Sequence, residues 1–338
     1  MRVDAWTHIF PAGYFARLQT LASAAGPLKR WMELPSLHDL DCRFRLMDAF
    51  ADYAQFLTPS MPPIEDLAEG ALAVDLMRLM NDGLAELVDR HPDRFPAFAA
   101  ALSLDDVDAA LAEIERAAAL GAAGVQLCTH VRGRPLDDPN YRPVFDALAE
   151  KRLAVWLHPV RGPSPDYPTE TRSRHEIWWC FGWPYDTSVA MARLVFSGLF
   201  DRHPELKIVT HHMGAMIPYF EGRIIQGWGR EMGSRTPAAD AHLLPGPLAR
   251  PPIDYFHMFY ADTALSGSTS ATRCGLDFFG IDKVVFATDF PFDAEGGGYL
   301  VRETIRALDE LSLSTEARRR IDHDNLAALI GRRWGYPS

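Results

Sequence analysis

Residues 283–292 read Lys-Val-Val-Phe-Ala-Thr-Asp-Phe-Pro-Phe, a short apolar run that ends abruptly in Asp289. Other apolar runs also end on possible metal ligands: residues 3–8 on His8, residues 153–158 on His158, and residues 207–212 on His211 and His212. In parallel α/β folds, polar groups at the carboxyl ends of buried strands lie at the rim where chemistry takes place. Four such endings along one chain predict a common site.

Eight short apolar segments alternate with helical patterns along the chain, which is typical of parallel βαβ units. We expect the strands near residues 3–8, 54–58, 94–100, 124–128, 154–158, 206–210, 258–262 and 283–288. The count of eight favours a closed (β/α)8 TIM barrel, and no G-x-G-x-x-G follows the first strand to indicate a dinucleotide fold. We predict a single domain over residues 1–338. An irregular segment is inserted after the first strand, up to about Arg45, and long loops follow strands five and six.

Composition excludes several classes of protein. The chain has 338 residues, of which 48% are hydrophobic, so it can bury a sizeable core. Its formal net charge of -11 disfavours nucleic acid as a partner. No apolar run approaches the roughly 18 residues of a membrane span, and we see no signal peptide. The four cysteines form no CxxC pair, which fits a reducing cytoplasm.

The residue types at the strand ends point to metal chemistry. Two imidazoles and a carboxylate suit Zn²⁺ and tolerate Mn²⁺ or Fe²⁺. Such an ion lowers the pKa of a bound water or polarises a substrate oxygen, and a nearby histidine can transfer a proton near neutral pH. The spacing alone leaves hydrolysis and decarboxylation both open.

Two sequence blocks carry a family resemblance. One is His212-Met213-Gly214-Ala215-Met216-Ile217-Pro218, of the form H-x-G-x-x-x-P, and the other is Thr288-Asp289-Phe290-Pro291-Phe292. Together with Leu157-His158-Pro159, they show that the chain resembles the amidohydrolase-2 branch of the amidohydrolase superfamily. Within that branch it is similar to 2-amino-3-carboxymuconate-6-semialdehyde decarboxylase and related aromatic-acid decarboxylases. The resemblance spans nearly the whole chain.

The resemblance implies roles for individual residues. His8, His158 and Asp289 would bind one divalent metal, zinc in the first place and manganese as an alternative, with no organic cofactor. His212 would act as the acid/base, and Asp289 would take part in catalysis. The residues that would contact the substrate are Trp179 and Phe292.

The first strand departs from the family pattern. The family has H-x-H or E-x-H there, whereas this chain has Trp6-Thr7-His8. An indole has one N–H donor and no lone pair for a metal. We therefore expect three protein ligands, with Trp6 contacting a flat substrate. Arg161 could face a substrate carboxylate, and Arg43 and Arg45 are further candidates for that role.

Two features have more than one interpretation. Adjacent residues on a strand face opposite sides, so we expect one of His211 and His212 to face the pocket, and we favour His212. The aromatic run at residues 177–183 is either a substrate lid or an interface, and we expect a homodimer.

The function expected from these residues is metal-dependent, non-oxidative decarboxylation of an aromatic or muconate-type acid. The partner would be a small-molecule carboxylic acid, with neither nucleic acid nor membrane involved. Alternatives are a hydrolase or hydratase acting on a lactone or related bond, possible without a metal, and a degenerate barrel that binds without catalysis.

Overall fold

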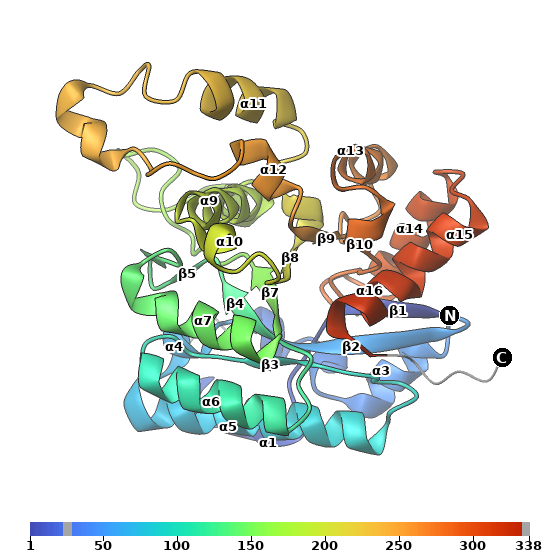
Figure 1. Ribbon diagram of the computed structural model, residues 1–338. Helices are drawn as coiled ribbons and strands as arrows, with labels where there is room; N and C mark the ends of the chain where they lie inside the picture. The colour runs from blue at the N-terminus through green and yellow to red at the C-terminus, as the bar shows by residue number, and fades with distance from the viewer. Residues whose placement is uncertain (23–28, 333–338) are drawn as a thin grey trace.

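The computed structural model describes residues 1–22 and 29–332, and Figure 1 shows the arrangement of their helices around a central set of strands. The strands are short and almost entirely buried. Those of the barrel are β1 (Arg2–Ile9), β2 (Tyr53–Pro59), β3 (Ala99–Ala101), β4 (Gly124–Cys128), β7 (Ala154–His158), β8 (Ile208–Thr210), β9 (Tyr260–Asp262) and β10 (Val284–Val285).

These eight strands form a closed parallel barrel. Strands β3, β4, β7, β8, β9 and β10 pair in that order, and β1 pairs with β2. The two sheets meet where Leu57 N donates to Ala97 O at 3.0 Å and where Ala5 N donates to Phe286 O at 2.8 Å. The predicted TIM barrel is confirmed.

Helices surround the barrel. The longer ones are α1 (Ala12–Ala22), α3 (Leu40–Met47), α5 (Gly70–Arg90), α6 (Val107–Ala119), α7 (Arg142–Lys151), α9 (Gly182–Phe196), α11 (Glu221–Arg230), α13 (Thr269–Phe279) and α14 (Gly298–Asp309). The shorter ones are α2 (Lys29–Met32), α4 (Ile64–Leu67), α8 (Ile177–Cys180), α10 (Leu199–Arg202), α12 (Pro252–Phe256), α15 (Thr315–Arg319) and α16 (Asn325–Ile330). No helix among residues 1–22 and 29–332 is long and apolar enough to cross a membrane.

Several predicted boundaries were wrong for local reasons. The insertion after β1 is helical rather than irregular, because α1 packs against α5 and Asp39 caps α3 by accepting from Cys42 N. The third strand begins at Ala99 rather than Arg94, after Pro96, which has no N–H for the ladder.

Long segments follow the fifth and sixth barrel strands, which are β7 and β8, as expected. Residues 159–176 separate β7 from α8. Residues 211–259 separate β8 from β9, and their helix α11 stands out from the barrel at the top of Figure 1.

Asp4 links the first and last strands. Its side chain is fully buried, and it accepts from Thr288 N at 3.0 Å, Thr288 Oγ1 at 2.5 Å and Tyr53 Oη at 2.6 Å. Burial disfavours the charged carboxylate more than these bonds favour it, and the pKa of Asp4 rises to about 7.

This raised pKa predicts a specific pH dependence of stability. Between pH 4 and pH 7 the folded Asp4 retains a proton that the unfolded chain has lost, so rising pH favours unfolding. Relative to Asp4→Asn, the parent should lose free energy of unfolding over that range, on the order of 4 kcal/mol at most. Urea denaturation of both proteins at stepped pH measures the difference. If the free energy of unfolding changed with pH in the same way in both proteins, the raised pKa of Asp4 would be contradicted.

Candidate metal centre

Three histidines converge at the mouth of the barrel. His8 is the penultimate residue of β1, His158 ends β7 and His211 follows β8, and all three side chains are buried. Their ligand atoms lie within 4.8 Å of one another. His211 also forms such a group with His212 and Asp289, so the four predicted strand ends do meet at one site.

A bulge in β1 aims its side chains at this site. The pairing with β2 shifts register between Asp4 and Thr7, so the usual alternation of faces is broken there. Val3, Ala5 and Trp6 all belong to the interior cluster, and the adjacent Ala5 and Trp6 lie within the shifted segment. Trp6 lies in the bulge and His8 just beyond it, and both rings lie beside those of His211 and His158.

Each of the three converging rings is held by its Nδ1 atom. Nδ1 of His8 lies 2.7 Å from Pro59 O, and Nδ1 of His158 lies 2.6 Å from Pro159 O. Nδ1 of His211 bonds Oδ2 of Asp262. Since a carbonyl or carboxylate oxygen only accepts, Nδ1 carries the proton and Nε2 of a neutral ring keeps its lone pair.

The inward nitrogens are not satisfied by protein. Nε2 of His8 and Nε2 of His211 are buried without a hydrogen bond among the described residues. A buried polar atom without a partner costs roughly 1–3 kcal/mol, and a bound cation removes that cost. The donor set therefore fits a divalent metal.

Asp289 faces these rings. Its Oδ1 lies 3.3 Å from Nε2 of both His8 and His211, and its Oδ2 lies 3.7 Å from Nε2 of His212. Burial would raise the pKa of Asp289, but the neighbouring His211, His212 and His8 imidazoles hold it well below its usual value. The carboxyl group is thus ionised, as a carboxylate ligand of a metal must be.

The expectation that one of the two adjacent histidines faces the pocket was wrong. Strand β8 ends at Thr210, so strand alternation no longer applies to His211 and His212. The next four residues, from His212 to Ala215, all have φ between +54° and +70°. This left-handed turn brings the two imidazoles into a stack with centroids 3.8 Å apart. Gly214 is required in the turn, because a Cβ there would lie 2.6 Å from the Phe279 ring.

Trp6 lies behind His211. The two rings stack with centroids 4.0 Å apart and 17° between their planes, and the indole has no exposed surface. The substrate contact expected of Trp6 stays a prediction, whereas its contact with His211 is a feature of this structure.

The outer wall of the site contains a cation that sequence reasoning missed. The Arg30 guanidinium lies 5.8 Å from the centroid of Trp179 and 5.5 Å from that of Phe292. The Phe292 ring is in turn 5.3 Å from that of His8, so this group adjoins the histidines. Among the described residues, no carboxylate forms an ion pair with Arg30. Arg30 lies in the insertion after β1, where neither a motif nor a strand end marked it as a site residue.

Two of the other three candidate arginines have partners. Nη1 of Arg161 lies 3.0 Å from Oδ1 of Asp186, so its charge is matched. Arg43 is fully buried and donates to Gln55 Oε1 and to His8 O, both at 2.7 Å. The expectation that Arg43 faces a substrate carboxylate was wrong, because it supports the backbone of β1 instead. Arg45 is exposed on α3.

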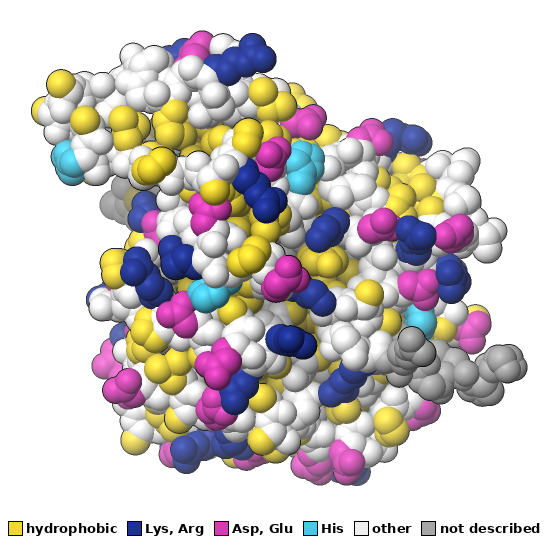
Figure 2. Space-filling view, in the orientation of Figure 1, with side chains coloured by type: hydrophobic (Ala, Val, Ile, Leu, Met, Phe, Trp, Pro, Cys, Tyr) yellow, Lys and Arg dark blue, Asp and Glu magenta, His cyan; other side chains and the backbone are white. Residues whose placement is uncertain are grey.

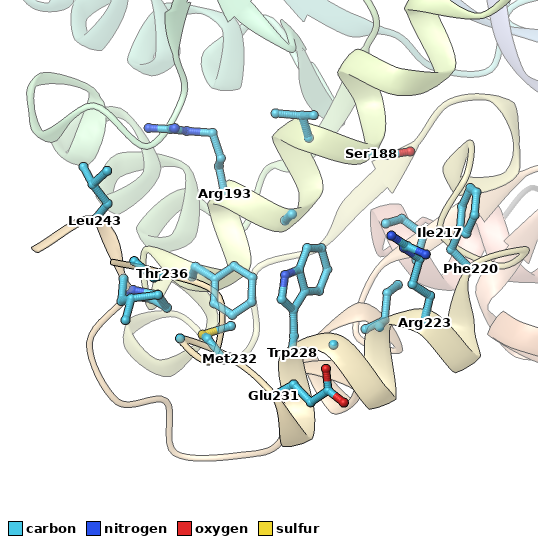
Figure 3. Close-up of a pocket in the computed structure, with 18 of the residues that line it drawn as sticks. Ser188, Arg193, Ile217, Phe220, Arg223, Trp228, Glu231, Met232, Thr236 and Leu243 are labelled. Carbon is cyan, nitrogen blue, oxygen red and sulfur yellow. The ribbon is translucent and has the colours of Figure 1, made fainter. Parts of the chain in front are cut away.

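A separate apolar groove lies between α9 and α11 and has a volume of about 890 Å³. Figure 3 shows Phe220, Trp228 and Met232 on its wall, with Ser188 and Arg193 on the α9 side. None of the histidines of the metal centre lines it, so it is distinct from the site described above.

The sequence profile of one family, described as amidohydrolase, matches residues 3–332. The chain belongs to the amidohydrolase family. It is 33% identical to a gamma-resorcylate decarboxylase of Rhizobium radiobacter over 90% of this chain and 95% of that protein. It is 28% identical to a 2-amino-3-carboxymuconate-6-semialdehyde decarboxylase of Dictyostelium discoideum over 72% of this chain and 64% of that protein.

A solved relative carries a metal. It is a dihydroxybenzoic acid decarboxylase from Polaromonas sp. JS666 with bound manganese and the inhibitor 2-nitroresorcinol. The two chains superpose with a TM-score of 0.76 at 28% identity, over 98% of this chain and 96% of the other.

Proposed function

We propose that this amidohydrolase catalyses metal-dependent, non-oxidative decarboxylation of an aromatic carboxylic acid. The observation that carries the proposal is the convergence of buried histidine nitrogens on the Asp289 carboxylate at the barrel mouth. The gamma-resorcylate decarboxylase relative supports the reaction class, and the manganese-bound relative supports the metal.

His8, His158 and Asp289 are the proposed core of the metal site. They contribute two imidazoles and one carboxylate, a set that suits manganese as well as zinc. A bound divalent ion would hold substrate oxygens and stabilise negative charge that develops on them.

His212 is the proposed proton donor. Its Nε2 faces Asp289 and its side chain is 20% exposed, so it is the histidine of this group that a substrate can reach. Burial, and then the neighbouring His211, lower the pKa of His212. A lowered pKa makes the protonated His212 ring a stronger acid. The negative charge of Asp289 beside the ring favours its protonated form, so that the proton is present to be given.

The proton balance of the reaction follows from these positions. His212 gives its proton to the ring carbon that carries the carboxylate. The bond from that carbon to the carboxylate then breaks, its electron pair returns to the ring, and CO₂ leaves. His212 recovers a proton from water, and no oxidant is consumed.

Arg30, Trp179 and Phe292 are the proposed substrate wall. Arg30 has no carboxylate partner among the described residues, whereas Arg161 is paired with Asp186. The two aromatic rings offer faces for a flat ring, and the guanidinium can pair with a carboxylate or phenolate oxygen.

The reaction class is tested with a panel of hydroxybenzoates that includes 2,6-dihydroxybenzoate. The protein loaded with Mn²⁺ or Zn²⁺ should release CO₂, and chelation of the metal should abolish release. His212→Asn should lower kcat by roughly 10²-fold or more, since the proton donor is lost. Turnover of esters or lactones without CO₂ release would reject the proposal in favour of a hydrolase.

Arg30 and Arg161 can be compared in a matched pair of variants. Arg30→Gln should raise KM about 10-fold or more, since a charge-assisted bond to the substrate is worth roughly 1.5–3 kcal/mol. Arg161→Gln should leave KM within about 3-fold. The reverse order of effects would transfer the substrate role to Arg161.

We further propose a homodimer that uses the face around the groove. Tyr185, Tyr219 and Leu243 are large side chains that are more than half exposed there, and Figure 2 shows hydrophobic side chains along the projecting segment at the top of the view. Light scattering should give twice the 37.8 kDa chain mass. Leu243→Asp should shift the mass toward that of the single chain. The cytoplasmic location stays a prediction.

A further inference from the structure

The four histidines at the barrel mouth fall into two kinds. His8, His158 and His211 are buried, and each is anchored through Nδ1 to an oxygen acceptor. Nδ1 of His212 is buried without any hydrogen bond among the described residues. Metal-ligating histidines characteristically donate their other N–H to a carbonyl or carboxylate, because that bond fixes the tautomer and the ring orientation. By this criterion, His211 belongs with His8 and His158.

The anchor of His211 is itself rigidly held. Oδ1 of Asp262 accepts from Met213 N and from Ala264 N, both at 3.1 Å, which leaves Oδ2 for the imidazole. Asp262 has no exposed surface. The carboxylate thus fixes the His211 ring in one orientation, with Nε2 directed toward His8, His158 and Asp289.

Trp6 also holds His211 in place, by packing against the face of its ring. Its indole covers one face of the His211 ring, and His212 covers the other. An indole at position 6 cannot bind a metal, but it fills the space behind the ring that can. Ring packing and the Asp262 bond together leave His211 little freedom except to present Nε2 to the centre.

We propose that His211 is a metal ligand, which supplies from the sixth barrel strand the coordination that Trp6 cannot supply from the first. The ligands of the centre are then His8, His158, His211 and Asp289, with His212 outside the coordination sphere as the proton donor. This inference rests on the metal site of the proposed function and adds a ligand to it.

The competing role for His211 is a buried ion pair without metal contact. In that role His211 would serve only to neutralise Asp262 and Asp289, and metal affinity would not depend on its Nε2. The two roles therefore differ in metal binding itself, which can be measured without substrate.

The test compares metal affinity in variants of the full chain. Each protein is stripped with a chelator and titrated with Mn²⁺, and free Mn²⁺ is followed by electron paramagnetic resonance. His211→Ala should weaken binding by roughly 10²-fold or more, whereas His212→Ala should stay within about 3-fold of the parent. Asp262→Asn should weaken binding by about 10-fold, the lower end of the effect known for residues that orient ligands.

The matched pair decides the outcome. His211→Ala that binds Mn²⁺ as tightly as the parent would overturn the inference, as would an equal loss in His212→Ala. If His211→Ala does not fold, as judged by circular dichroism, Asp262→Asn takes its place, and parent-like affinity in that variant would overturn the inference equally.

The measurement separates this inference from the proposed reaction. If Mn²⁺ binding depends on His211 but the parent releases no CO₂ from any acid, the ligand assignment is supported and the decarboxylase is rejected. If the parent releases CO₂ but His211→Ala keeps full metal affinity, the decarboxylase is supported and the assignment of His211 as a ligand is rejected.

Discussion

Closure of the barrel between its first and last strands is the constraint on which the site depends. His8 lies in β1 and Asp289 follows β10, and these strands are at opposite ends of the sequence. The backbone bonds from Ala5 to Phe286 and from His8 to Phe290 bring them together. The carboxyl group of Asp4, bonded to Thr288, then fixes the residue next to Asp289. A barrel that opened here would separate His8 from Asp289 before it lost most of its core.

The electrostatics of the mouth favour a bound cation. Three imidazoles lie fully buried around one carboxylate, so each protonated ring would repel the others in a medium of low dielectric. Burial and the neighbouring His8 and His211 hold the pKa of His158 well below its usual value. Without a metal, burial is outweighed by Asp262 and Asp289, which raise the pKa of His211 to about 9, so a bound ion would replace the proton on Nε2. A single divalent ion satisfies the lone pairs and the carboxylate together.

The sequence pattern predicted most of this arrangement, because eight buried strands read as short apolar runs between helical patterns and their carboxyl ends must share one rim. It failed where backbone geometry departs from regular strands. The bulge in β1 and the left-handed turn at His212 are not encoded by periodicity, so the shared orientation of His211 and His212 could not be read from their adjacency. Arg30 was missed because it reaches the site through tertiary packing of the insertion.

The contact between Trp6 and His211 also limits the order in which this site can change. Because the two rings stack, neither position is free to vary alone. With His211 in the proposed ligand role, a chain that acquired the tryptophan first would pass through a centre with one ligand fewer, whereas a chain that acquired the histidine first would not. Once both are in place, a histidine returned to position 6 would leave a gap where the indole packs. Exchanges at positions 6 and 211 are therefore expected to have non-additive effects on metal binding, because the two rings share one contact.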